Sequence, residues 1–274
     1  MSRVFPLLLV LAAAVALGFL LLPVLAIFLR IPPGDLLDGM RSEAAIDAVL
    51  VTAKTSAIAN LLILLVGTPA AYLIATRRFA GRALVITLIE LPLVLPPAVA
   101  GIGLLAAFGR FGLLGDQLTA LGLSIPFTQI AVVLAVTFVA SPFYLRAAIA
   151  AFEAVDPNLP AAARTLGASP ARTFFRVALP LAAGGLGAGW ALSFARGIGE
   201  FGATIMFAGS LQGVTQTLSL AIYEQFDVRF ELALAIGAEL AVVSAAILLV
   251  VKLLPSWTRS PSGSTTLFAP SRST

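Results

Sequence analysis

The most constraining feature of this sequence is a set of long apolar stretches without any charged residue. Residues 4–29, 55–76 and 117–145 contain no Asp, Glu, Lys or Arg. Each stretch exceeds the roughly 20 apolar residues that a helix needs to cross a bilayer. Charged residues make up only 11% of the chain, against about 25% in an ordinary soluble domain. The sequence therefore predicts an all-α integral membrane protein.

The lengths of the apolar stretches predict about six transmembrane helices within a membrane domain over residues 1–254. The first stretch is longer than the roughly 7 to 15 apolar residues of a cleavable signal, so we expect it to be retained as a span. Residues 255–274 are rich in Ser, Thr, Pro and Arg and are expected to form a disordered cytoplasmic tail. The predicted spans are 4–29, 51–76, 83–107, 128–145, 179–203 and 232–251.

Basic residues gather in alternate loops between the predicted spans, and this pattern predicts the orientation of the chain. Cytoplasmic loops of membrane proteins carry an excess of Lys and Arg. The opposite loops carry mainly acidic residues, such as Asp35, Asp116 and Glu224. We therefore expect a multi-pass membrane protein with both termini in the cytoplasm. The basic residues on that side are Arg77, Arg78, Arg82, Arg146, Arg164, Arg172, Arg176, Lys252 and Arg259.

Helix-breaking residues interrupt several predicted spans. Pro69, Pro142 and the run 91–97 (LPLVLPP) fall inside apolar stretches. Proline frees backbone carbonyl groups that need partners inside a bundle or a wet cavity, which favours a pathway-forming bundle over a simple anchor. Residues 201–223 are uncharged but rich in Gly, Ser, Thr and Gln. There we expect the end of the fifth span, followed by a re-entrant or interfacial segment.

Missing residue types exclude several classes of function. The chain has no Cys and no His, which excludes Cys/His metal sites and imidazole catalysis; we expect no catalytic residue and no metal site. Neither Lys54 nor Lys252 follows a Gly, so the sequence lacks a phosphate-binding loop for ATP. Membrane insertion accounts for the net charge of +4, and no nucleic-acid partner is expected.

Residues 156–180 combine two sets of helix start and stop signals. Asp156 and Pro157 predict the start of a short helix, and Gly167 predicts its end. Ser169 and Pro170 repeat the start signal for a second short helix. A helix of about ten residues is marginal alone in water. Its small apolar face favours packing in a groove of a protein partner over insertion among lipid headgroups. That face consists of Leu159, Ala162, Ala163 and Leu166.

This segment resembles the cytoplasmic loop of binding-protein-dependent ABC importer permeases, which carries the pattern E-A-A-x-x-x-G-x(9)-I-x-L-P. The spacing is intact, although Ala161 stands where the family often has Glu and Val177 stands for Ile. The resemblance implies a type I importer permease fold, with a coupling helix seated in a groove of a separate ATPase subunit. The missing Glu removes one polar contact to that subunit. The residues assigned to coupling are Ala161, Ala162, Ala163, Arg164, Gly167, Leu179 and Pro180.

A second pattern is a charged pair within residues 194–204 (FARGIGEFGAT). Arg196 and Glu200 lie four residues apart, and we expect them on one face of a helix at membrane depth or at its outer edge. Charges there are costly, so the two side chains should pair. The pair is either a structural link between neighbouring spans or part of a transport pathway, and the sequence leaves both interpretations open.

The same stretch is similar to a signature of oxyanion permeases, the molybdate/tungstate branch in particular, with sulfate permeases as near relatives. Residues 90–101 (ELPLVLPPAVAG) and 216–223 (QTLSLAIY) share this similarity. It implies a permease that works as a lipid-embedded homodimer with two ATP-binding cassette subunits and an extracytoplasmic oxyanion-binding protein. ATP and Mg²⁺ would bind to the ATPase, and no cofactor to this chain. The residues assigned to the pathway or gate are Arg196, Glu200, Phe201, Gly202 and Thr204.

Other functional classes stay open at this point. A sulfate ABC permease would share the same architecture. A secondary transporter would use Arg196 and Glu200 as an ion or proton relay, but the sequence shows no convincing internal repeat. A membrane enzyme with paired carboxylates and a metal is disfavoured, because the Asp residues fall outside the predicted spans and none forms a close pair.

Overall fold

The computed structural model of the chain describes residues 4–253; the predicted tail at 255–274 lies outside this range. Within it the elements are all helical, and no strand is formed. In chain order they are α1 (Val4–Leu29), α2 (Pro33–Met40), α3 (Glu43–Thr76), α4 (Arg82–Val94), α5 (Pro97–Phe108), α6 (Gly115–Ala120), α7 (Gln129–Glu153), α8 (Asn158–Thr165), α9 (Pro170–Thr173), the π-helical turn η1 (Phe174–Ala178), α10 (Leu179–Ile198), α11 (Gly202–Ala208), α12 (Leu218–Phe226) and α13 (Phe230–Leu253).

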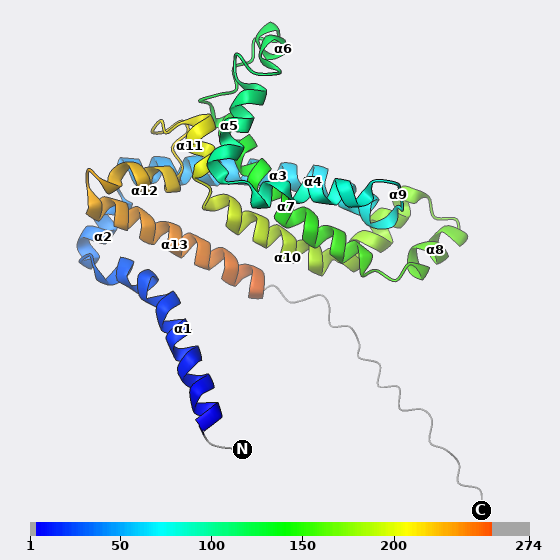
Figure 1. The fold of residues 1–274 in the computed structure, drawn as a ribbon, viewed down its shortest axis with the longest axis horizontal. Coiled ribbons are helices and arrows are strands. Elements are labelled where there is room, and N and C mark those ends of the chain that lie inside the picture. Colours follow the sequence, from blue (N-terminus) through cyan, green and yellow to red (C-terminus); the bar gives the residue numbers. More distant parts are fainter. Residues whose placement is uncertain (1–3, 254–274) are drawn as a thin grey trace, which may run out of the picture.

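Three long helices form the centre of the molecule, with α7 packed against both α3 and α10 (Figure 1). Small side chains make this packing close: Ala140 and Ala148 of α7 are fully buried. A Cβ atom on Gly189 of α10 would lie only 2.6 Å from the Cβ atom of Ala147. Small residues at helix contacts let backbones approach each other, which is how helices associate in a bilayer without a hydrophobic driving force.

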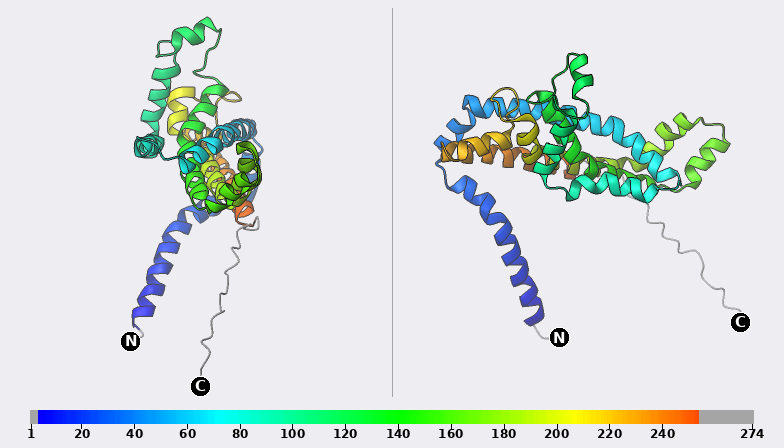
Figure 2. Two further views of the ribbon diagram at one scale, coloured as in Figure 1. Left: turned by 90° about the vertical axis from the view of Figure 1, so that its right-hand side faces the viewer. Right: turned by 45° about the horizontal axis from the view of Figure 1, so that its top comes forward.

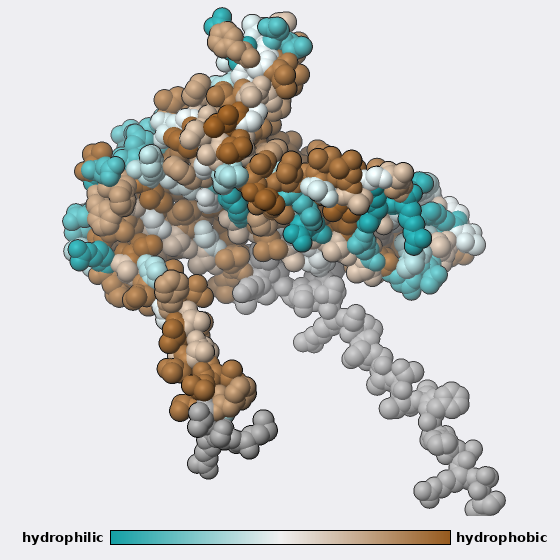
Figure 3. Space-filling model, in the orientation of Figure 1, coloured by the Kyte–Doolittle hydropathy of each residue, from teal (hydrophilic) through white to brown (hydrophobic). Residues whose placement is uncertain are grey.

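The two ends of the bundle differ. At one end α2, α12 and α13 pack together and against α3, around a small core that includes Leu218 and Ile236. At the other end only the α8–α9 hairpin projects beyond the long helices (Figures 1 and 2). The first helix, α1, diverges from the bundle, and none of its apolar window is buried. Brown, apolar surface covers much of the flank of the bundle, whereas hydrophilic side chains gather at both ends (Figure 3).

The prediction of about six spans is confirmed, with one modification. Five helices are long and apolar enough to cross a membrane, and a bent pair of helices supplies the sixth candidate. The predicted span 83–107 is not one straight helix, because α4 and α5 meet at an angle of 114°. Pro92 lies within α4, and Pro96 precedes the start of α5 at Pro97. The expectation that the run 91–97 breaks the helix is therefore confirmed.

Three predicted boundaries are wrong. The fourth predicted span ends at residue 145, but α7 continues to Glu153. The second short helix of the loop is not separate, because α9, η1 and α10 form one continuous helix over Pro170–Ile198. This helix ends at Ile198 rather than at residue 203, since Gly199 follows it as a C-cap. The segment 201–223 contains α11 and the start of α12, neither long enough to span a bilayer.

Candidate functional site

The exposed helix α8 is the first candidate site. It contains no buried residue, and Leu159 and Leu166 are 47% and 87% exposed although both are apolar. Ala161, Ala162 and Arg164 are exposed as well, and Ala163 is half-buried. Within residues 4–253, α8 contacts only α9 and η1 appreciably. An eight-residue helix with this exposure has little of its own to hold it in place.

Local hydrogen bonds define both ends of α8 as the sequence predicts. The Asp156 carboxylate accepts a hydrogen bond from the Asn158 amide at 2.9 Å. At the other end Gly167 has φ +84°, and the Gly167 and Ala168 amides donate to the carbonyls of Arg164 and Ala163. These two bonds form a Schellman motif, which favours glycine at the left-handed position. The ends of α8 are therefore defined by hydrogen bonds within its own segment.

The base below α8 is packed against the central bundle. Ser169 caps α9 by accepting a hydrogen bond from the Arg172 amide at 3.2 Å, and Thr173 is fully buried. The Phe174 ring of η1 packs against Tyr72 of α3 and Phe152 of α7, with ring centroids 4.8 and 6.3 Å apart. This aromatic group fixes the start of the long helix to the central bundle, so α8 projects from an anchored support.

The coupling residues predicted from the sequence fall into two groups. Ala161, Ala162, Ala163, Arg164 and Gly167 lie on α8 or at its end. Leu179 and Pro180 instead start α10, beyond the π-helical turn, where Leu179 is half-buried and Pro180 exposed. The sequence pattern thus spans one exposed helix and the first turn of the helix that supports it.

The Arg196–Glu200 pair forms a second, buried site. The Nη2 atom of Arg196 lies 2.8 Å from Oε2 of Glu200, and the Glu200 side chain is only 1% exposed. The two residues do not share a helix, because α10 ends at Ile198. Instead Glu200 accepts a hydrogen bond at 2.7 Å from the Ala203 amide at the start of α11. One carboxylate therefore neutralises Arg196 and caps the next helix.

The neighbouring predicted pathway residues pack within the same junction. A Cβ atom on Gly202 would lie 2.7 Å from Cβ of Pro97, so glycine allows α11 to approach α5. The Phe201 ring contacts that of Tyr223, with 5.0 Å between centroids. Thr204 is fully buried, and its hydroxyl has no hydrogen-bond partner in the described part of the chain. The structure brings these residues together as a helix junction.

A further charged pair was not predicted as a site. Nε of Arg146 lies 3.1 Å from Oε1 of Glu90, and the two side chains are 61% and 38% exposed. The sequence predicts that Arg146 lies in a loop, because the predicted span ends at position 145. Arg146 directly follows an apolar stretch that contains a proline. Nothing in the sequence there indicates that α7 continues beyond it. A second ion pair, between Arg82 and Glu153, joins the start of α4 to the end of α7.

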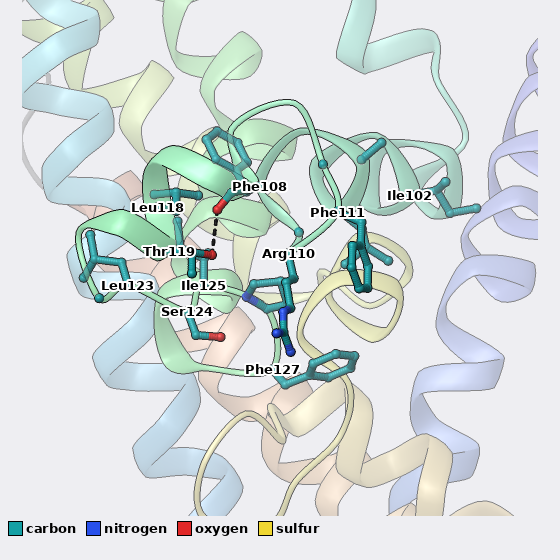
Figure 4. A pocket seen from close by; sticks show the side chains of 17 residues that line it. Ile102, Phe108, Arg110, Phe111, Leu118, Thr119, Leu123, Ser124, Ile125 and Phe127 are labelled. Carbon is teal, nitrogen blue, oxygen red and sulfur yellow. Dashed lines mark hydrogen bonds between the residues drawn. The ribbon is translucent and has the colours of Figure 1, made fainter.

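A cavity of about 800 Å³ lies apart from all of these sites, in the projecting arm formed by α5, α6 and the following loop. Its lining is mostly apolar and includes Phe108 and Phe127, with Arg110, Thr119 and Ser124 as polar side chains (Figure 4). None of the sequence-predicted site residues lines it. Within residues that the structure describes, no group of acidic side chains could hold a metal ion.

Comparison with known proteins gives consistent results. Residues 64–260 match the family described as "Binding-protein-dependent transport system inner membrane component". The chain is 42% identical to the molybdenum transport system permease protein ModB of Mycobacterium bovis over 239 residues, covering 87% of this chain and 90% of the relative. It is 39% identical to ModB of Escherichia coli K12, covering 77% and 91% of the two chains.

Solved structures with a similar fold include chains of two ABC transporters. A chain of a bacterial alginate ABC transporter superposes with a TM-score of 0.72 at 19% identity, covering 91% of this chain and 93% of that one. A chain of the MetNI methionine ABC transporter gives a TM-score of 0.58 at 18% identity, with coverage of 76% and 92%. At these identities the likeness concerns the fold, and it confirms the predicted permease architecture.

The relatives are permease subunits of transport systems, so the prediction of a transport subunit rather than an enzyme is confirmed. A family match over more than half of the chain agrees with relatives that align along nearly their whole length. The chain therefore belongs to the family of binding-protein-dependent transport system inner membrane components.

Proposed function

We propose that this chain is the membrane permease of an ATP-driven molybdate importer, and that two copies form the translocation pathway. The observation that carries the proposal is the 42% identity to a molybdenum permease over 87% of this chain. An alignment of that extent takes in the central spans, the exposed helix and the Arg196–Glu200 junction. Two separate ATPase subunits would supply ATP and Mg²⁺, and an extracytoplasmic protein would deliver the oxyanion.

The exposure of α8 supports its role as the coupling helix. Its apolar residues Leu159 and Leu166 are exposed on a helix that is closed at both ends by its own hydrogen bonds. Helix-in-groove docking uses such a face, with apolar anchors spaced three and four residues apart. The ATPase would hold α8, and the anchored base at Phe174 would carry its displacement into the long helix.

The same end of the bundle is proposed to face the cytoplasm of the bacterial inner membrane. Arg164 and Arg172 lie in the α8–α9 hairpin, and Arg82 lies at the start of α4 near the end of α3. An excess of Arg at one end of a bundle indicates the cytoplasmic side. The opposite end, with α2 and α12, would then meet the binding protein, and both termini would be cytoplasmic as predicted.

The proposal is tested by measuring ATP hydrolysis and ion uptake by the permease, reconstituted with its ATPase and binding protein. Molybdate, tungstate and sulfate are titrated separately. Molybdate should stimulate both activities most strongly. Stimulation by sulfate alone would reassign the ion, and uptake that continues without ATP but fails without a membrane potential would replace the proposal with a secondary transporter.

The coupling role is tested by paired substitutions on opposite faces of α8. Ala163→Arg places a long charged side chain on the face that we assign to the ATPase, and ATPase binding should be lost. Thr165→Arg places the same side chain about 200° away around the helix, at an exposed position where binding should be retained. Equal effects of the two substitutions would contradict docking through the Leu159–Leu166 face.

A further inference from the structure

Two ion pairs join α4 to α7 at different depths. The Arg82–Glu153 pair lies at the start of α4 and at the end of α7. Arg82 also donates from Nε to the Ile74 carbonyl at 2.9 Å, close to the end of α3. Three helices therefore end or begin at this level. We take this level as the edge of the membrane-spanning part of the bundle.

The Glu90–Arg146 pair lies well inside that edge. Glu90 is eight residues along α4 from Arg82, and Arg146 is seven residues before Glu153 on α7. At 1.5 Å per residue these separations correspond to about 12 and 10 Å along the helices. The pair therefore sits about a third of the way into a hydrocarbon core of about 30 Å.

The charge of this exposed pair argues against acyl chains as its neighbour. The Arg146 and Glu90 side chains are 61% and 38% exposed, and α4 has no buried residue at all. Charged groups at this depth are costly in contact with acyl chains and almost always face a bundle interior or a water-filled cavity. Figure 3 shows hydrophilic side chains that interrupt the apolar surface beside α4 and α7. These charges therefore favour a water-filled space beside this face rather than lipid.

Arg146 also has free binding capacity. A guanidinium group carries five N–H donors, and the ion pair uses Nε. No hydrogen bond from the two terminal amino groups of Arg146 is formed within residues 4–253. By contrast, Arg196 is paired with a carboxylate that is 1% exposed. The Arg196 side chain is 28% exposed and that of Arg146 is 61% exposed, so Arg146 presents the more accessible fork of donors.

We infer that Arg146 lines a water-filled vestibule on the α8 side of the pathway and binds the permeating oxyanion there, with Glu90 as its counter-ion when the vestibule is empty. The inference rests on the proposed function and adds a contact residue to it. An arginine fork fits two oxygens of a tetrahedral oxyanion. Glu90 offsets the charge, so the anion is held weakly enough to leave, as conduction requires.

The competing explanation is that the pair only fastens α4 to α7. The two explanations differ in what surrounds Glu90. A fastener between packed helices requires no water, whereas a vestibule requires water on this face at all times when the pathway is open to the α8 side. They also differ in the effect expected when both charges are removed together. A fastener that is neutral at both positions should still allow transport, whereas an oxyanion site without its positive charge should not.

Water access is measured with single cysteines, because the chain has none of its own. Glu90→Cys is compared with Leu88→Cys, at nearly the same depth on α4 but about 200° away and 57% exposed. In the reconstituted transporter without nucleotide, a negatively charged methanethiosulfonate should label the Glu90→Cys variant at least about tenfold faster than the Leu88→Cys variant. Molybdate should slow the labelling at position 90. Slow labelling of both variants, or no protection by molybdate, would overturn the inference.

The need for the charge is measured with Arg146→Gln and with the double substitution Glu90→Gln/Arg146→Gln. Arg146→Gln should lower molybdate uptake about tenfold or more, since charge-assisted hydrogen bonds are the strong ones. The neutral double variant keeps polar side chains at both positions and removes any unpaired charge. Uptake should stay low in the double variant, and its recovery would show that the pair is only a fastener.

The proposed function and the vestibule site fail in different experiments. If the unmodified transporter shows no molybdate-stimulated uptake, the proposed function is wrong. If it transports molybdate while the thiol introduced at position 90 stays unlabelled, the function stands and the vestibule site is wrong. Retained assembly of the Arg146→Gln permease with the ATPase, measured by co-purification, ensures that a loss of uptake is not a loss of folding.

Discussion

The two arginine–carboxylate pairs within the apolar segments have the same chemistry and opposite surroundings. Glu200 is 1% exposed and also caps α11 through the Ala203 amide. Glu90 and Arg146 are 38% and 61% exposed and join two helices on the surface of the bundle. The carboxylate of the signature pair is thus buried, with Arg196 at 28% exposure, whereas both side chains of a pair outside the predicted site are more accessible. Burial of the charge, rather than its presence in an apolar segment, separates the structural pair from the accessible one.

The largest expected effect breaks the buried pair. Glu200→Ala removes the carboxylate that neutralises Arg196 and caps α11, so it should destabilise the permease by about 3–5 kcal/mol. Glu90→Ala should cost less than about 1 kcal/mol, as for exposed pairs. Thermal unfolding of the purified permeases in detergent measures both. Similar losses for the two variants would remove the distinction drawn between the pairs.

A second expected effect concerns the packing that surrounds the buried pair. Gly202→Ala places a Cβ atom 2.7 Å from Cβ of Pro97 and 3.2 Å from the Ala98 amide nitrogen. Overpacking of this kind costs about 1–3 kcal/mol. The matched control is Gly199→Ala, where no atom lies within 4 Å of the new Cβ atom. The same unfolding measurement should show a clear loss for the first variant and little for the second.

A smaller effect is expected on transport from the accessible pair. Glu90→Gln leaves the Arg146 charge in place without its counter-ion, so the oxyanion should be held more tightly and released more slowly. The maximal uptake rate should fall about two- to fivefold, in line with the free energy of an exposed ion pair. Unfolding should hardly change. An increase in the maximal rate would show that Glu90 does not oppose anion binding.

The smallest expected effect concerns the Thr204 hydroxyl. The side chain is fully buried, and the hydroxyl lacks a partner in the described residues. Thr204→Val keeps the shape and removes an unsatisfied polar group, so stability should stay within about 0.5 kcal/mol or rise slightly. Molybdate uptake should also be retained. A strong loss of uptake would restore Thr204 to the pathway to which the sequence resemblance assigned it.

Local patterns predicted some elements closely. Asp156, Gly167 and Ser169 define the ends of α8 and the start of α9 through hydrogen bonds with residues two to five positions away. Such bonds depend on nearby residues only, so sequence alone reveals them. The six apolar stretches could also be predicted, because the thickness of a bilayer sets the length of each span.

Features that depend on distant contacts were not predictable. The prolines at 92 and 96 indicate that the helix breaks. They do not indicate the angle of 114° between α4 and α5, which goes together with the packing of α5 against α11. Gly101 allows that contact, since a Cβ atom there would lie 2.6 Å from the Ala203 carbonyl oxygen. Likewise, the helical spacing of Arg196 and Glu200 concealed a helix end between them, because Glu200 finds its second partner in the following helix.

The continuous helix from Pro170 to Ile198 has a mechanical consequence. Its 29 residues form a rod of about 43 Å, anchored at one end by aromatic rings and ending at the Arg196–Glu200 junction. The π-helical turn at Phe174–Ala178 sets the angular phase of α8 relative to that rod. Deleting a single residue there would return the turn to α-helical geometry and change the orientation of α8 relative to the rod. This one turn thus helps to set the direction in which a displacement of α8 reaches the Arg196–Glu200 junction.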